Sequence, residues 1–192
     1  MEPEQLDLIK NVQNGDTGAF VGLAYHYRSK MLTLAFSITG NVEDAKDITQ
    51  DTFLRAFKYV YSFRPQDKML NWLYKININL CRDLLRQKEK HTILLGIYLR
   101  KYQDYYVFGD HLLIDFKDNL EMCLKFLTPR ERAVFTLRDM KELSIKETVQ
   151  ILNSTEASVK KSLFSARRKL KDRLKQFYPS IEKGSLTKRL NF

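Results

Sequence analysis

Three aspartates, Asp44, Asp47 and Asp51, come closest in this chain to a catalytic or metal-binding cluster. Spaced three and four residues apart, they share one face of a helix, where carboxylates can hold a cation. Neither a histidine nor a second carboxylate segment lies at ligand spacing from them. The sequence therefore predicts no metal site, no cofactor and no enzyme activity.

Two roles without chemistry suit the same acidic face. The aspartates lie in the first turns of a helix that we expect to begin after Asn41, and carboxylates there stabilise the positive end of the helix dipole. With Gln50 beside them, they also form a negative surface on which a basic protein partner can dock. The residues alone do not decide between these two roles.

The two cysteines, Cys81 and Cys123, each lie inside a helical pattern with no second Cys or His at ligand spacing. We interpret them as buried free thiols. The N-terminus is acidic and lacks the features of a signal peptide, and the longest apolar run, residues 93–99, is too short to span a bilayer. We expect a cytoplasmic protein without membrane insertion.

A different chemistry, the neutralisation of phosphates, is indicated by residues 157–175. This segment holds eight Lys or Arg residues against one acid, Asp172, a density typical of DNA-binding helices. Its apolar residues recur at helical spacing and predict one packed face: Val159, Leu163, Ala166, Leu170 and Leu174. Taken alone, a basic amphipathic helix is equally typical of an ordinary protein surface.

The segments before this helix favour DNA binding. Thr128 and Ser144 are each followed three residues later by a glutamate, so two capping boxes predict two helix starts. Asn153 tolerates the left-handed backbone of a tight turn, and Thr155 can cap the basic helix directly afterwards. Two short helices, a tight turn and a basic third helix give the outline of a helix-turn-helix.

The composition agrees with a nucleic-acid partner. The chain has 192 residues, 44% of them hydrophobic, which suits one or two small helical domains. Its formal net charge is +10 and its pI about 9.5, which points to a polyanion.

A second basic stripe is expected on a helix from Trp72 to Lys90, where Lys75, Asn79, Arg82 and Arg86 share one face. Aromatic residues crowd its beginning, and rings beside cations suit single-stranded DNA, because rings stack on unpaired bases and cations follow the backbone. The same aromatics would form the core of an ordinary helical domain. Residues 91–118 lose the helical periodicity, and we interpret them as a connection that is apolar enough to pack in part.

In the order of these parts the chain resembles bacterial RNA polymerase sigma factors of the extracytoplasmic-function (ECF) type, in the sigma-70 family. The resemblance covers residues 15–90 and 120–174, and its most specific motifs are residues 44–56, 72–79 and 127–132. It implies an all-α fold of two small helical domains joined by a linker. The implied division is sigma region 2 at 1–90, the linker at 91–118, the region 4 helix-turn-helix at 119–176 and a tail at 177–192.

The resemblance also implies roles for residues. In the family the acidic helix docks on the clamp helices of the largest subunit of core RNA polymerase, which assigns core binding to Asp44, Asp47, Gln50, Asp51 and Arg55. The tryptophan helix and the loop before it open the promoter −10 element and hold a flipped base. That role falls on Tyr61, Phe63, Arg64, Gln66, Lys68, Trp72, Lys75, Asn79, Arg82 and Arg86.

The basic helix reads the promoter −35 element in the family, with Arg130 and Arg132 as expected phosphate contacts. The other residues assigned to this element are Thr155, Ser158, Lys160, Lys161, Phe164, Ser165 and Arg168. An anti-sigma factor is the further partner that the family implies. One departure from the family is Asn77, which replaces a small apolar residue.

The expected function is therefore to recruit core polymerase to promoters and to help melt them. The alternative is a helix-turn-helix regulator that acts without polymerase, which would leave the first ninety residues without a task in DNA binding. A recombinase-like enzyme would need a nucleophile among clustered arginines or a metal-holding carboxylate set, and neither is found.

Overall fold

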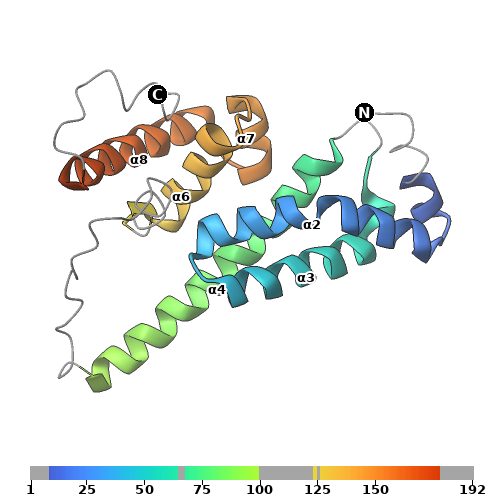
Figure 1. Ribbon diagram of the computed structural model, residues 1–192, viewed down its shortest axis with the longest axis horizontal. Helices are drawn as coiled ribbons and strands as arrows, with labels where there is room; N and C mark the ends of the chain where they lie inside the picture. The colour runs from blue at the N-terminus through green and yellow to red at the C-terminus, as the bar shows by residue number, and fades with distance from the viewer. Residues whose placement is uncertain (1–8, 65–67, 100–122, 125, 178–192) are drawn as a thin grey trace.

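The computed structural model describes residues 9–64, 68–99, 123–124 and 126–177, with the backbone alone at 90–99 and 175–177. These residues confirm the predicted all-α fold and contain no strand (Figure 1). In chain order the elements are α2 (Thr17–Thr39), α3 (Val42–Tyr59), a 3-10 turn (Val60–Ser62), α4 (Met69–Leu99), α6 (Pro129–Phe135), a π-helical turn (Thr136–Met140), α7 (Ile145–Leu152) and α8 (Glu156–Phe177). No helix in these ranges has the length and apolar character needed to cross a membrane.

Helices α2, α3 and α4 pack against one another and form the front unit (Figure 1). The Asp16 side chain caps α2 by accepting a hydrogen bond from the backbone N–H of Ala19. The helix ends at Gly40, whose φ of 69° is the left-handed conformation that glycine adopts without strain. Asn41 then caps α3, so the boundaries agree with the capping signals in the sequence.

The core of the front unit contains one polar junction, at Asn77. This residue is fully buried on α4, and its Nδ2 donates to the backbone oxygen of Met31 at 3.4 Å and to the hydroxyl of Thr52 at 3.1 Å. The thiol of Cys81 donates to its Oδ1. Since these bonds tie α4 to both α2 and α3, they satisfy the buried amide of Asn77 and explain why the core tolerates a polar residue there.

Helix α4 is longer than the sequence analysis predicted. It begins at Met69 rather than Trp72, and it continues past Lys90 to Leu99. The prediction that this helix ends at Lys90 was therefore wrong, because residues 91–99 continue it. That run contains no proline to break the helix, and its three leucine residues favour helix, so α4 continues through it although Gly96 lowers its helix propensity.

Helices α6, α7 and α8 form the rear unit, and both predicted capping boxes are confirmed. Thr128 and Glu131 close the start of α6, and Ser144 and Glu147 close the start of α7. Asn153 has the expected left-handed backbone, with φ 46°. The predicted apolar stripe of α8 is also confirmed, because all five of its residues are buried.

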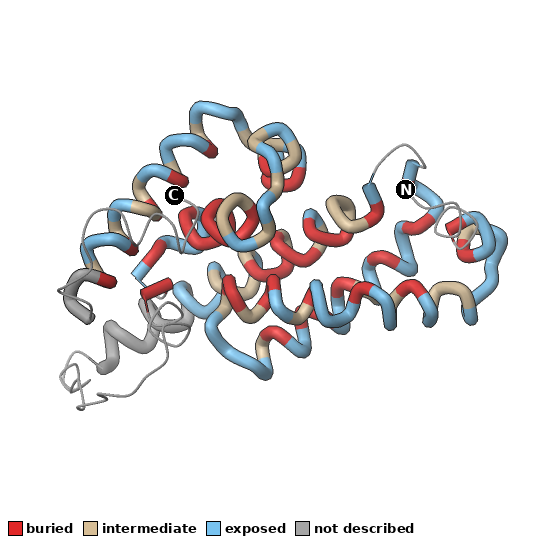
Figure 2. The backbone as a smooth tube through the Cα atoms, turned by 45° about the horizontal axis from the view of Figure 1, so that its top comes forward, coloured by how far each residue is buried: buried red, intermediate tan, exposed pale blue. Residues whose placement is uncertain are grey.

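The two units contact each other, α4 packing on α7 and α2 on α6. Buried residues of both units form one continuous apolar cluster, in which Met31 and Ile38 of α2 belong with Val134 and Ile151 of the rear unit. Figure 2 draws the buried stretches of both units in red along the tube. The structure is thus a closed arrangement, in which the helix-turn-helix lies against the bundle.

Candidate nucleic-acid interface and partner surface

Helix α8 presents a basic outer face. Lys160, Lys161 and Arg168 are exposed, and Phe164 among them has 69% of its surface exposed. The buried stripe on the opposite side holds this face outward, while the hydroxyl of Thr155 caps the helix by accepting from the backbone N–H of Ser158 at 3.3 Å. A basic helix face with one exposed ring can neutralise phosphates and contact base edges in a major groove.

One buried carboxylate fixes the position of α8. Glu131 of α6 accepts a hydrogen bond from the hydroxyl of Ser165 at 2.6 Å and pairs with the ammonium of Lys169 at 2.7 Å. Burial by itself raises the pKa of Glu131, but the bonds from Lys169, Ser165 and Thr128 outweigh it and lower the pKa to about 2. Ser165, assigned to DNA from the sequence, is thus already bonded inside the unit.

The two arginines expected to contact phosphates have different surroundings. Arg130 is exposed, and its guanidinium donates to the hydroxyls of Ser154 and Ser158 at 2.5 and 2.6 Å. Arg132 is only 8% exposed and donates to the backbone oxygen of Ile38, at the end of α2. The assignment of Arg132 to phosphate is therefore corrected, because its guanidinium is used in the contact between the units.

Among the residues expected to contact the −10 element, too, some are buried and others are exposed. Phe63 is buried, and Trp72 packs on it edge to face with ring centroids 5.4 Å apart, so the assignment of Phe63 to base stacking is corrected. Asn79 is half-buried, and its amide oxygen accepts from Arg82. Four others are exposed: Tyr61, Arg64, Lys75 and Arg86. Gln66 lies outside the described residues.

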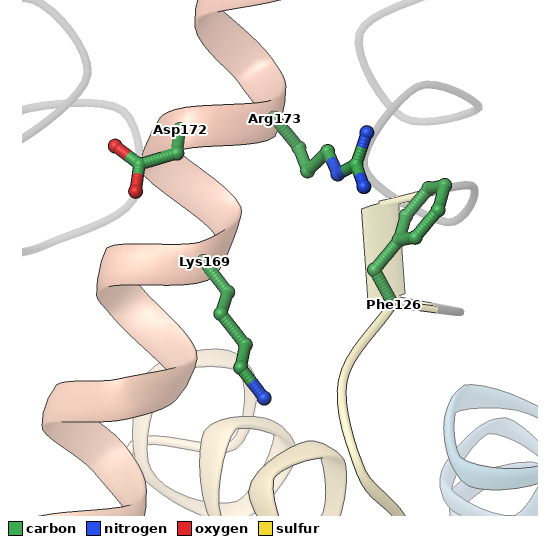
Figure 3. A pocket seen from close by; sticks show the side chains of 4 residues that line it. All are labelled: Phe126, Lys169, Asp172 and Arg173. Carbon is green, nitrogen blue, oxygen red and sulfur yellow. The ribbon is translucent and has the colours of Figure 1, made fainter.

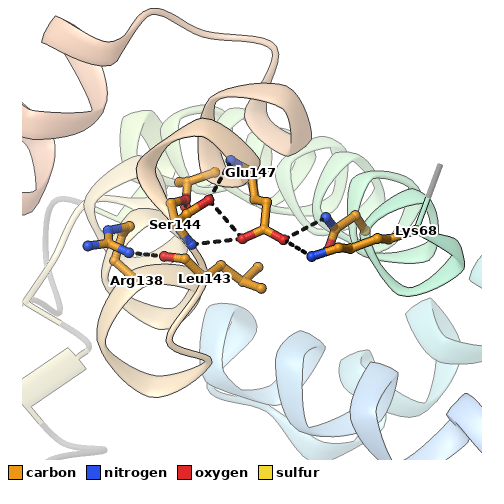
Figure 4. A network of polar contacts seen from close by, with 7 residues as sticks. Lys68, Arg138, Leu143, Ser144 and Glu147 are labelled. Carbon is orange, nitrogen blue, oxygen red and sulfur yellow. Dashed lines mark hydrogen bonds and ion pairs between the residues drawn. The ribbon is translucent and has the colours of Figure 1, made fainter. Parts of the chain in front are cut away.

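Lys68 is exposed as well, but it faces the rear unit. Its ammonium lies 2.6 Å from Glu147 Oε1, at the start of α7 (Figure 4). A polar cleft runs between α4 and α7 at this point, and Trp72 and Lys75 line it together with Lys68 and Glu147. Part of the expected −10 surface therefore lines the contact between the units.

The acidic face of α3 is open to solvent. Asp47 and Asp51 are exposed, as are Gln50 and Arg55, whereas Asp44 is half-buried and pairs with Lys88 of α4 at 2.5 Å. The structure therefore brings together four of the five residues assigned to the polymerase contact and gives the fifth an intramolecular partner.

An apolar groove beside this face was missed in the sequence analysis. It runs between α2 and α3, where Tyr25 is 83% exposed and Val21 is 68% exposed, and Leu54 and Phe57 line it from α3. Val21 and Tyr25 lie one turn apart and off the buried stripe of α2. The sequence signal for this groove was the repeat of large apolar residues on a helix face other than the packed one.

A smaller pocket lies where the chain enters the rear unit. The guanidinium of Arg173 stacks over the ring of Phe126, 4.1 Å from its centroid, and Lys169 and Asp172 complete the lining (Figure 3). This contact fixes the segment before α6 against α8.

The described residues contain no metal-binding cluster, and their two cysteines are buried. No group of three His, Cys, Asp or Glu side chains among them could hold a metal ion. Both cysteines are buried and unpaired, and burial raises the pKa of Cys81 to about 12 and that of Cys123 to about 11. The arrangement in these ranges is suited to binding.

Comparisons with known proteins match the front and rear units to two different family models. The family model described as Sigma-70 region 2 matches residues 23–91, and that described as Sigma-70, region 4 matches residues 117–170. The ECF RNA polymerase sigma factor SigW of Bacillus subtilis is 30% identical over 177 residues, covering 87% of this chain and 95% of SigW. The RNA polymerase sigma-H factor of Pseudomonas aeruginosa is 25% identical, over 86% of this chain and 91% of its own.

Solved structures show the same fold. The sigma factor RpoE of Bartonella quintana, crystallised with the anti-sigma factor NepR, has a TM-score of 0.63 at 19% identity, over 81% of this chain and 96% of that one. CnrH, in complex with the cytosolic domain of CnrY, has a TM-score of 0.64 at 23% identity, over 89% of this chain and 97% of its own.

The low pKa of Glu131 predicts a pH effect on stability. Because its folded pKa of about 2 lies below the ordinary 4.5, its contribution is present above pH 4.5 and is lost as pH falls towards 2. Glu131→Gln removes the charge and keeps a side chain that can cap. We expect the wild type to lose about 2 kcal/mol more unfolding free energy than this variant across that range.

Urea unfolding at a series of pH values, followed by circular dichroism, measures this difference. Glu142→Gln, at an exposed residue of the same unit, is the matched control and should follow the wild type. Equal pH dependence in the wild type and Glu131→Gln would contradict the role of Glu131.

Proposed function

This chain belongs to the sigma-70 family as an ECF-type RNA polymerase sigma factor, and from this membership we propose how its two units divide the work. The chain binds core RNA polymerase and directs promoter-specific initiation of transcription, by recognising −35 and −10 elements and aiding the melting of DNA. We assign region 2 to residues 1–90, the linker to 91–118 and region 4 to 119–176.

The rear unit is assigned to the −35 element. The observation that carries this assignment is the exposed basic face of α8, set on a helix-turn-helix whose helices are capped and whose inner stripe is buried. Lys161, Phe164 and Arg168 would approach base edges, and Arg130 and Lys160 would contact phosphates. Arg132 has no place in this set, because it is buried.

The front unit is assigned to the −10 element and to polymerase. The exposed cations of α4 and the exposed Tyr61 suit a separated DNA strand, and Asn79 is the proposed contact to a flipped base. The exposed acids of α3 would dock on a basic polymerase surface. Burial of the neighbouring apolar groove would add a hydrophobic contribution to this binding.

The remaining assignments follow from the family. We propose a non-catalytic initiation subunit that works in the cytoplasm, where promoters and polymerase are found. An anti-sigma factor is the proposed regulatory partner, as in the complex of RpoE, a protein of the same fold, with NepR. A helix-turn-helix regulator acting without polymerase is not favoured, because both sigma regions are matched in order.

Charge reversal on α3 tests the polymerase contact. The double variant Asp47→Lys, Asp51→Lys should bind core polymerase at least about tenfold more weakly, since two cations would replace two anions in the contact. Surface plasmon resonance against immobilised core measures this loss. The control is Asp83→Lys, which reverses the charge of an exposed residue on α4 and should bind normally. Normal binding of the double variant would exclude the acidic face as the docking surface.

Truncations on α8 test the reading of the −35 element. Lys161→Ala or Arg168→Ala should weaken binding to the cognate duplex by about 1 to 3 kcal/mol where a base contact is lost. Fluorescence anisotropy on the cognate duplex and on a scrambled one separates the two possible roles. A loss of equal size on both duplexes would show a phosphate contact, and a smaller salt dependence would accompany it.

A further inference from the structure

In the contact between α4 and α7, the carboxylate of Glu147 lies against two donors of α4 that could also bind a phosphate. Lys68 Nζ and Asn71 Nδ2 both point at Glu147 Oε1, at 2.6 and 3.4 Å (Figure 4). An ammonium and an amide N–H are donors of the kind that proteins use for the DNA backbone. Asn71 has no role among the residues assigned to DNA above.

Glu147 performs two tasks with different oxygens. Oε2 accepts from the backbone N–H and the hydroxyl of Ser144 and closes the capping box of α7, while Oε1 faces the front unit. Bonds from Lys68 and then Ser144 lower the pKa of Glu147 to about 2, so the carboxylate is charged at neutral pH. The cap fixes this charge in place opposite Lys68.

The charge also lies on the surface assigned to the −10 strand. Trp72 and Lys75 line the same cleft as Lys68 and Asn71, and α7 forms its other wall. The outer face of α8 remains exposed in the same arrangement. The closed chain therefore covers part of its −10 surface and leaves its −35 surface open.

We propose that Lys68 and Asn71 form a binding site for a backbone phosphate of the −10 strand, and that Glu147 occupies this site in the closed chain in place of the phosphate. The inference rests on the proposed function, because it takes the surface around Trp72 as the −10 surface. A single DNA strand and α7 then compete for one site. Separation of the units frees the site for DNA.

Glu147→Gln tests the competition, because glutamine keeps the capping box and removes the charge that holds Lys68. The probe is a fluorescein-labelled oligothymidylate, with binding to the full chain followed by anisotropy. Affinity should rise about threefold, the range set by a partly exposed ion pair. Binding of a mixed-sequence duplex, which needs only the open face of α8, should stay unchanged.

A double-mutant cycle with Lys68→Ala locates the effect. If Glu147 acts by covering Lys68, the gain from Glu147→Gln should disappear in the Lys68→Ala background. Asn71→Ala should lower the affinity of the Glu147→Gln chain for the oligothymidylate. Glu142→Gln, which makes the same change of charge at an exposed residue near α7, should leave the affinity at the wild-type value.

Two results would overturn the proposal. One is an equal gain in Glu147→Gln and Glu142→Gln, which would reflect net charge alone. The other is a gain that persists without Lys68. Circular dichroism confirms that each variant is folded. Transcription by the wild-type chain with core polymerase is measured separately. The binding assays then report on the competition between Glu147 and DNA, and the transcription assay reports on the sigma function.

Discussion

The rear unit depends on the carboxylate of Glu131. A helix start leaves backbone N–H groups without partners, and Glu131 satisfies that of Thr128 at the start of α6. The same side chain reaches Ser165 and Lys169 on α8, so the local device that starts one helix also sets the orientation of another. The outward direction of the basic face follows from this bond pair and from the buried stripe behind it.

Local signals in the sequence were sufficient for the helices and for most of their boundaries. Caps at Asn41, Thr128 and Ser144 and the left-handed turn at Asn153 depend on neighbours within a few residues, and all were found as expected. The stripe on α8 follows from the period of the helix in the same way. Contacts between distant segments were not available from such patterns.

The sites that the sequence misjudged are those decided by distant partners. The resemblance to the family implied a phosphate contact for Arg132, but its guanidinium donates to the backbone oxygen of Ile38 at the end of α2. Phe63 looked like a stacking ring, yet it fills the core beside Trp72. Asn77 had no explanation until Met31 and Thr52 were seen around it. The residues proposed for polymerase and DNA contacts otherwise stay predictions.

In the proposed function, one chain brings core polymerase to two separate promoter elements. Transcription in vitro by core polymerase with this chain, on a library of random promoters sequenced at their RNA start sites, tests it most directly. We expect RNA that depends on the chain, with two enriched upstream blocks at a constant spacing. An absence of chain-dependent RNA from every template, with polymerase active alongside another sigma factor, would contradict it.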